Sequence, residues 1–179
     1  IPAFPDDAKG LLTTAIRDDD PVFFLESERM LGMKGHVPEG DHLVPFGKAL
    51  VRRDGTDVTL VSFGRPVHFC LEAAEELAKE GISCEVIDGR TIRPLDIETI
   101  EASVRKTNKV LVAYEDSLSW GYGAELAARI ADDLFAWLDA PVRRLAATDT
   151  FVAYAPELED VILPQTSDVE AAVRALHAF

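Results

Sequence analysis

The sequence has few positive charges and no long apolar run. Lys and Arg number 18 against 32 Asp and Glu, so the net charge of the 179 residues is −14 at pH 7. Because a protein this acidic repels phosphate backbones and anionic lipid surfaces, we expect no nucleic acid and no membrane among its partners. No stretch approaches the ~20 apolar residues of a membrane-spanning helix, and the first residues do not resemble a signal peptide. We therefore expect a soluble, intracellular protein.

Cysteine is equally scarce, since Cys70 and Cys84 are the only two. Both lie in apolar segments, without CxxC spacing and without a pair of histidines that could complete a zinc site. We expect two reduced, buried thiols with a structural role. The sequence also begins without Met, as a processed protein, a trimmed one or a piece of a longer one would.

From Thr56 onward the sequence alternates between short β-branched runs and longer stretches with helical periodicity. This alternation is typical of βαβ units around a parallel sheet. The predicted strands are 57–63, 84–87, 109–114 and 142–146. The predicted helices run from Pro66 to Gly81, from Asp96 toward the strand at 109, from Gly121 and Gly123 toward Pro141, and from an S-x-x-E capping box at Ser167–Glu170 to Phe179.

The first 30 residues fit this domain poorly. Asp6–Arg17 predicts a helix and Pro21–Leu25 a buried strand, whereas Gly32–Asp54 has the glycine and proline content of a linker. One helix and one strand cannot bury their own apolar faces. This helix and strand either pack against the main sheet or are the last unit of an upstream domain.

The residues alone define no catalytic centre. There is no GxSxG or HExxH motif, and His36, His42, His68 and His177 have no spacing that defines a metal site or a nucleophile. Gly121 and Gly123 could cradle an anion at a helix N-terminus, but a tight turn with close packing is the favoured interpretation.

One helix end offers oxygen ligands. At Ala15–Asp20 the unpaired carbonyls of a helix C-terminus lie beside three carboxylates. From the residues alone, a solvated run of charge is favoured over a cation site.

A series of short motifs follows the chain in order: Asp7-Ala8-Lys9-Gly10-Leu11, Gly55-Thr56-Asp57-Val58-Thr59, Arg65-Pro66-Val67, Leu71-Glu72-Ala73-Ala74, Glu85-Val86-Ile87-Asp88, Arg90-Thr91-Ile92-Arg93-Pro94-Leu95-Asp96, Lys106-Thr107-Asn108, Leu138-Asp139-Ala140-Pro141-Val142 and Tyr154-Ala155-Pro156. Together they resemble the beta subunits of thiamine-dependent 2-oxoacid dehydrogenases, most closely the pyruvate type. The resemblance runs essentially from end to end. It departs at Gly89, where the family usually has a larger residue, and at 117–123, which differs from the commoner Thr-Gly-Gly-Phe-Gly form.

The resemblance implies an α/β fold with three αβα layers and a mainly parallel, five-stranded sheet of the transketolase C-terminal type. It implies that residues 1–30 are the last helix and strand of a truncated pyrimidine-binding domain, that 31–54 form a linker and that 55–179 form the C-terminal domain. The family's catalytic glutamate and histidine come from the part upstream. No catalytic or cofactor-binding residue is therefore assigned here, and we expect the chain alone to be inactive.

Two sites also follow from the resemblance. In the family a helix-end segment holds a structural potassium ion, and the matching residues are Ala15, Asp18 and Asp20, with Asp20 in place of the family's Asn. An aspartate and the terminal carboxylate anchor the family's enzyme to the subunit-binding domain of the dihydrolipoyl acyltransferase, and they match Asp139 and Phe179. That domain is basic, so the acidic chain suits it. The alternative for Asp139 is a plain turn residue before Pro141.

The implied function is that of the C-terminal part of a beta subunit of the pyruvate dehydrogenase type, with subunit association and docking to the acyltransferase core as its task. The intact enzyme uses thiamine diphosphate and magnesium, which this chain alone does not bind. The implied partners are an alpha subunit, a second beta subunit and the acyltransferase, in the bacterial cytoplasm or the mitochondrial matrix. The alternatives are a branched-chain 2-oxoacid or acetoin dehydrogenase beta subunit and a non-enzymatic α/β assembly module.

Overall fold

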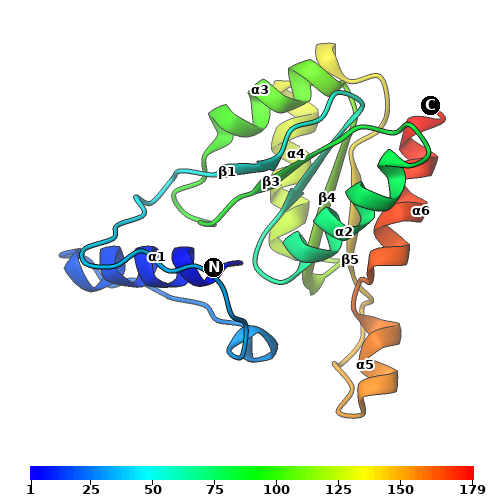
Figure 1. Ribbon diagram of the computed structural model, residues 1–179. Helices are drawn as coiled ribbons and strands as arrows, with labels where there is room; N and C mark the ends of the chain where they lie inside the picture. The colour runs from blue at the N-terminus through cyan, green and yellow to red at the C-terminus, as the bar shows by residue number, and fades with distance from the viewer.

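The computed structural model describes residues 1–179 and is built around one five-stranded sheet (Figure 1). The strands are β1 (Leu50–Arg53), β2 (Val58–Ser62), β3 (Cys84–Asp88), β4 (Val110–Ser117) and β5 (Arg143–Ala147), in the order β1-β3-β2-β4-β5. Strands β2 to β5 are parallel, and β1 pairs antiparallel with β3. The predicted mainly parallel, five-stranded sheet is confirmed.

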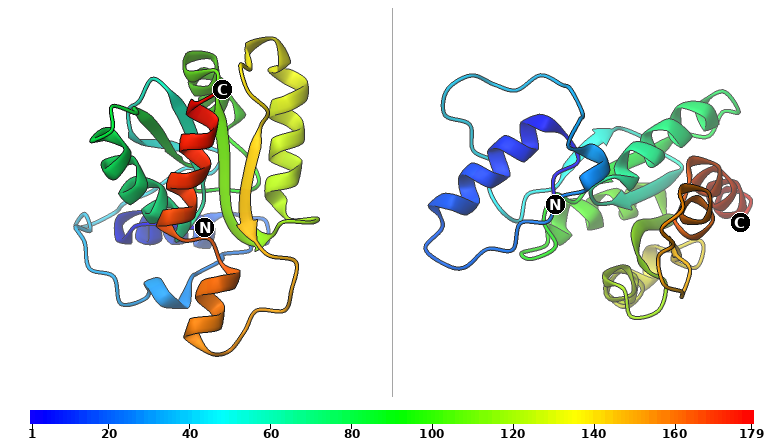
Figure 2. Two further views of the ribbon diagram at one scale, coloured as in Figure 1. Left: turned by 90° about the vertical axis from the view of Figure 1, so that its right-hand side faces the viewer. Right: turned by 90° about the horizontal axis from the view of Figure 1, so that it is seen from below.

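Helices cover both faces of the sheet (Figure 2). On one face α2 (Pro66–Ala78) and α6 (Thr166–His177) pack over a core that includes Leu60, Leu111 and Val173. On the other face α3 (Ile97–Thr107) and α4 (Tyr122–Asp133) pack over Val61 and Val112. Successive residues of a strand point to opposite faces, so the apolar runs of β2 and β4 supply both cores. This gives the three αβα layers that were predicted.

Helix α3 shows how local sequence sets the element boundaries. The Asp96 carboxylate accepts a hydrogen bond from the Thr99 backbone N–H at 3.2 Å, so Asp96 is the N-cap of the helix that was predicted to begin there. The helix ends at Asn108, which adopts a left-handed conformation with φ 61°, the geometry that Gly or Asn best tolerates. Asn108 thereby turns the chain into β4.

The N-terminal segment lies beside the layered body (Figure 1). It contains α1 (Pro5–Arg17), as predicted, and a short 3₁₀ turn, η1 (Glu28–Met30). The strand predicted at Pro21–Leu25 is wrong, because no residue from 21 to 26 makes a backbone-to-backbone hydrogen bond. A strand needs a neighbour to pair with, and no strand of this chain lies beside the segment.

Four further features of the structure differ from what the sequence predicts. Strand β1 falls inside residues 31–54, the range predicted as a linker. A helix, α5 (Pro156–Ile162), forms where none was predicted, and α4 gives way to a 3₁₀ turn, η2 (Phe135–Trp137). The capping box of α6 uses Gln165 and Asp168 instead of Ser167 and Glu170, so that helix begins two residues earlier.

Both cysteines are free and buried, as predicted. Burial raises the pKa of the Cys70 thiol to about 12 and that of Cys84 to about 11. No helix in the structure combines the length and the apolar character that a membrane crossing would require.

Candidate functional site

Asp139 lies in the turn that connects η2 to β5, at the end of the sheet where the parallel strands begin. Its backbone N–H donates to the Asn108 carbonyl at 2.9 Å. The Asn108 amide in turn donates to the Trp137 carbonyl at 2.6 Å, so two hydrogen bonds fix the turn to Asn108. The Asp139 side chain is exposed, and its carboxylate accepts no hydrogen bond within the chain. A carboxylate on a rigid turn is preorganised to receive a cationic partner.

Phe179 ends the chain at the same end of the sheet (Figure 1). The Lys109 ammonium donates to the His177 carbonyl at 3.0 Å and holds the last turn of α6 next to the start of β4. Phe179 remains 66% exposed. Asn108 contacts the Asp139 turn, and its neighbour Lys109 contacts the last turn of α6. Because these two residues are adjacent in the chain, the turn that contains Asp139 and the end of the helix that precedes Phe179 lie at the same end of the sheet.

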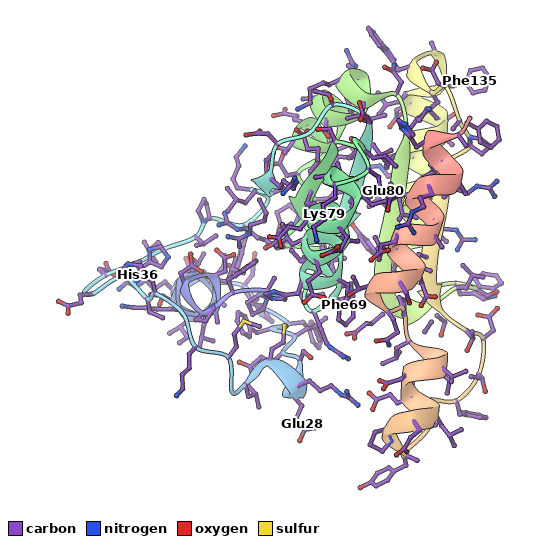
Figure 3. The ribbon with its side chains drawn as sticks, turned by 45° about the vertical axis from the view of Figure 1, so that its right-hand side comes forward. Glu28, His36, Phe69, Lys79, Glu80 and Phe135 are labelled. Carbon is purple, nitrogen blue, oxygen red and sulfur yellow. The ribbon has the colours of Figure 1, made fainter.

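An apolar groove lies directly beside Asp139. Its walls come from the last turns of α4, from η2 and from the turn that precedes β5, and it includes Ala131, Phe135, Leu138 and Pro141. Phe135 projects from this end of the molecule into solvent (Figure 3). A groove of small and apolar side chains with a carboxylate at its rim suits a protein surface that offers apolar residues next to a Lys or Arg.

The candidate cation ligands Ala15, Asp18 and Asp20 lie within one turn of the end of α1. Asp18 is the C-cap residue, and its carboxylate accepts the Asp20 backbone N–H at 3.0 Å. Both carboxylates are exposed. No group of three or more His, Cys, Asp or Glu side chains in the structure has the arrangement of a metal site. Any cation here would therefore depend on carbonyl oxygens as well as on these two carboxylates.

Gly121 and Gly123 serve close packing instead of cradling an anion. A Cβ atom at Gly123 would collide with the Tyr114 ring, and one at Gly121 would collide with the Ser117 carbonyl. The interpretation as a tight turn is confirmed. His68 is likewise structural, because its Nε2 lies 2.7 Å from the Ala3 carbonyl oxygen and its ring packs on Phe4.

The carboxyl edge of the sheet, where ligands commonly bind in open α/β sheets, has its charges paired within the chain. A crevice between β2 and β4 contains Glu115 and Asp116. Burial raises the pKa of Glu115, and Arg65, 3.2 Å away, opposes the rise. The Asp116 carboxylate accepts the Tyr122 backbone N–H at 3.2 Å. No group here has the unpaired, perturbed character of a general acid or base.

The sequence reasoning missed a buried charge network. Arg52 of β1 pairs with Asp7 of α1 and with Asp88 of β3, both fully buried, and Arg90 also pairs with Asp7 at 2.7 Å. The Arg52 guanidinium stacks on the Phe4 ring, 4.0 Å from its centroid. Asp88, a charged residue at the end of a strand predicted to be buried, was the available signal, because a buried carboxylate requires a cationic partner.

The fold and the matching family model define the class of this chain. The model described as transketolase, C-terminal domain, matches residues 47–169. The chain therefore belongs to the transketolase C-terminal domain family. A solved structure titled "Split gene transketolase, inactive beta4 tetramer" has a similar fold, with a TM-score of 0.66 and 29% identity over 80% of this chain and 46% of that one.

Among curated proteins the chain is similar to beta subunits of 2-oxoacid dehydrogenases. It is 49% identical over 174 residues to pyruvate dehydrogenase E1 component subunit beta of Rattus norvegicus, covering 94% of this chain and 48% of the relative. It is 46% identical over 181 residues to 2-oxoisovalerate dehydrogenase subunit beta of Bacillus subtilis (strain 168), covering 100% of this chain and 55% of the relative. The chain thus spans about half the length of the curated relatives it matches.

Proposed function

We propose that this chain is the C-terminal part of the beta subunit of a thiamine-dependent 2-oxoacid dehydrogenase of the pyruvate type. Its own task is subunit association and docking of the enzyme to the acyltransferase core. The observation that supports the docking role is that Asp139, at the rim of an apolar groove, and the last turn of α6 lie at the same end of the sheet. The similarity to two kinds of 2-oxoacid dehydrogenase beta subunit supports the enzyme class.

Under this proposal residues 1–30 are the end of a pyrimidine-binding domain and residues 31–54 lead into the C-terminal domain. The exposure of Phe23 and Leu25, in the segment with no strand to pair with, supports an upstream domain as their missing neighbour. The complete enzyme joins this subunit with an alpha subunit and a second beta subunit. It works in the bacterial cytoplasm or the mitochondrial matrix.

Thiamine diphosphate and magnesium belong to the complete enzyme, where the coenzyme supplies the electron sink for decarboxylation. Under this proposal the chain alone binds neither of them, because the family's catalytic glutamate and histidine lie in the upstream part. The carbonyl and carboxylate oxygens at the end of α1 could hold a structural potassium ion at Ala15, Asp18 and Asp20. If it binds there, potassium raises the melting temperature of the complete enzyme above that in sodium, and Asp18→Ala abolishes the difference.

The docking proposal is tested by calorimetry at low salt with the isolated, basic subunit-binding domain of the acyltransferase. Asp139→Ala and deletion of Phe179 should each weaken binding by about tenfold or more, since truncated charge pairs at interfaces cost about 2–5 kcal/mol. Asp132→Ala removes another exposed carboxylate near the end of α4 and is the matched control. If the variant that combines Asp139→Ala with deletion of Phe179 bound the subunit-binding domain as tightly as the wild type does, the docking proposal would be wrong.

The substrate is a separate question, because the two relatives differ by only a few per cent in identity to this chain. Co-expression with an alpha subunit and the upstream half of the beta subunit allows a direct assay. Decarboxylation of pyruvate, without activity on branched-chain 2-oxoacids, supports the pyruvate type. The reverse preference supports the branched-chain alternative, and failure to associate with any alpha subunit supports a non-enzymatic assembly module.

A further inference from the structure

Two segments form a lobe at the carboxyl end of β4 and β5, opposite the Asp139 end. They are the loop 118–120 and residues 148–162, which include α5, and we call them the carboxyl-edge lobe. Helix α5 extends away from the layered body (Figures 1 and 2). The Ser119 backbone N–H and hydroxyl donate to the Asp149 carboxylate at 2.8 and 2.6 Å. The Leu118 N–H donates to the Ala147 carbonyl at 2.9 Å, so the two segments form one unit.

The lobe exposes large apolar side chains. Trp120 and Tyr154 are fully exposed and Phe151 is 97% exposed. The aliphatic members are Val152, Leu158 and Val161. Single exposed apolar residues are ordinary on a protein surface, but six large ones on two segments that are hydrogen-bonded to each other are typical of an interaction surface. Aromatic residues on such a surface are the usual anchors of a protein interface.

Helix α5 has little support within the chain. It has seven residues and no extensive packing against another helix or strand. Helices this short do not persist in water without tertiary contacts. Its one long-range side-chain ion pair joins Glu159 to Arg29 of η1. The exposed face of α5 is therefore short of the packing that would stabilise it.

Trp120 adds a second sign of a missing partner. Its φ of 66° lies in the left-handed region, which is unfavourable for a bulky side chain. Nothing in the chain packs on the Trp120 ring to offset that conformation. Strained backbone of this kind persists at sites where a side chain is presented to a ligand or partner.

The charge of the lobe indicates what the partner must be. Residues 148–162 contain four acidic residues and no Lys or Arg. Arg29 pairs with Glu159 and Arg144 lies close to Asp149, whereas Glu157 and Asp160 are exposed and have no cationic partner within the chain. A complementary surface is therefore basic at its rim and apolar at its centre. A second copy of this chain is a poor match, because it carries the same net charge of −14.

We infer that the carboxyl-edge lobe is the surface by which this chain binds the alpha subunit, through a basic and apolar patch of that subunit. The inference rests on the proposed function, since it takes the alpha subunit from there. It adds a surface that is separate from the Asp139 end. Trp120 and Tyr154 act as apolar anchors, and Glu157 and Asp160 orient the basic rim.

The test uses the complete beta subunit, which is this chain with its upstream half, and the alpha subunit. Trp120→Asn keeps a residue that tolerates the left-handed backbone, and Tyr154→Ser removes a fully exposed ring, so neither should unfold the chain. Combined, they should weaken association with the alpha subunit by about tenfold or more, as the loss of interface anchors does. Glu157→Lys with Asp160→Lys should slow association most at low salt.

The controls are Phe135→Ser, which removes an exposed ring at the opposite end of the molecule (Figure 3), and Glu98→Lys on the exposed face of α3. Both should leave the affinity unchanged. Hydrogen exchange at residues 148–162 provides a second readout, because it reports which partner covers the lobe. The amides should be protected only when the alpha subunit is added.

Three results would overturn the inference, and they are distinguishable. If the lobe variants bind the alpha subunit as tightly as the wild type does, the lobe is not the contact, although the proposed function stands. If the lobe is already protected in the beta subunit alone, the upstream half or a second copy covers it. If the wild-type subunit binds no alpha subunit, the proposed function and this inference both fail.

Discussion

Arg52 and Asp88 join the antiparallel edge strand to the buried end of β3. The Nε and Nη2 atoms of Arg52 lie 3.2 and 2.9 Å from one carboxylate oxygen of Asp88. The same guanidinium pairs with Asp7 of α1. One side chain therefore links the N-terminal helix, the edge strand and the sheet, and Arg90 adds a second ion pair to Asp7.

Replacing Arg52 should be strongly destabilising. Arg52→Ala leaves the buried carboxylates of Asp7 and Asp88 with less compensation, and breaking a buried pair in this way costs about 3–5 kcal/mol. Urea unfolding followed by circular dichroism measures the loss. Arg105→Ala is the control, because its pair with Glu101 lies on the exposed face of α3 and should cost less than about 1 kcal/mol. Equal losses in the two variants would contradict the role of the network.

Asp88 should make stability fall as pH rises through the acid range. Burial raises the pKa of its carboxyl group above the usual value, and Arg52 opposes that rise only in part. The folded state therefore holds the proton more tightly than the unfolded state. The associated stabilisation is complete below the usual Asp pKa of about 3.9 and is lost as pH rises through the folded pKa.

The comparison that isolates this effect is Asp88→Asn, which preserves shape but cannot ionise. Urea unfolding of both proteins from acid to neutral pH should show the wild type losing stability relative to the variant as pH rises above about 3.9. A difference that is constant over this range would show that Asp88 has the same pKa in the folded and unfolded states.

The N-cap of α3 should behave in the opposite way. Burial by itself would raise the pKa of Asp96, but hydrogen bonds from Thr99 and from the Ala49 N–H outweigh it, so the pKa of this carboxyl group is lowered. Its contribution is present above the unfolded pKa and is lost as pH falls through the folded pKa. Asp96→Ala should cost about 0.5–2 kcal/mol at neutral pH, measured by thermal unfolding. Asp96→Asn, which still caps, should recover most of the loss; no recovery would assign the effect to the charge alone.

Gly123 should tolerate no side chain. Gly123→Ala places a methyl group against the Tyr114 ring, and forcing extra volume into a packed site costs about 1–3 kcal/mol. Gly32→Ala is the matched control, because nothing lies within 4 Å of a Cβ atom there. The double variant Gly123→Ala with Tyr114→Ala should lose less than the sum of the two single losses. Full additivity would show that the ring is not the obstacle.

The two thiols should be unreactive in the folded protein. The pKa of Cys70 is raised to about 12 and that of Cys84 to about 11, so neither forms thiolate near pH 8. A thiol reagent such as Ellman's reagent should modify them at the rate of unfolding, and both should react at once in urea. Rapid modification of either thiol without denaturant would contradict the burial.

Local patterns predicted much of the fold because they act over short distances. The apolar runs of β2, β3 and β4, the Asp96 N-cap and the glycine turn before α4 each express preferences of a few neighbouring residues. The same reasoning was wrong at Pro21–Leu25, whose apolar run predicts a strand, because strand formation depends on a paired neighbour.

Of the candidate sites, the sequence suggested Asp139 and Phe179 through family resemblance, but their common location depends on packing. The two residues lie at the same end of the sheet because α6 returns along the sheet and its last turn is held by Lys109, a contact across 68 residues. Likewise, nothing in the sequence of 148–162 distinguishes a buried loop from an exposed lobe. That difference depends on the few contacts that α5 makes with the rest of the chain.

By itself the sequence determined the acidic charge, the alternation of strands and helices, and the family motifs, since these are properties of composition and of local spacing. Only the tertiary structure decided that β1 closes the sheet antiparallel to β3, that Arg52 pairs with two buried carboxylates, and that the Asp139 end and the carboxyl-edge lobe lie at opposite ends of the domain. The reason is physical: these features join residues far apart in the chain, and their free energy depends on burial and pairing that exist only after the layers have packed.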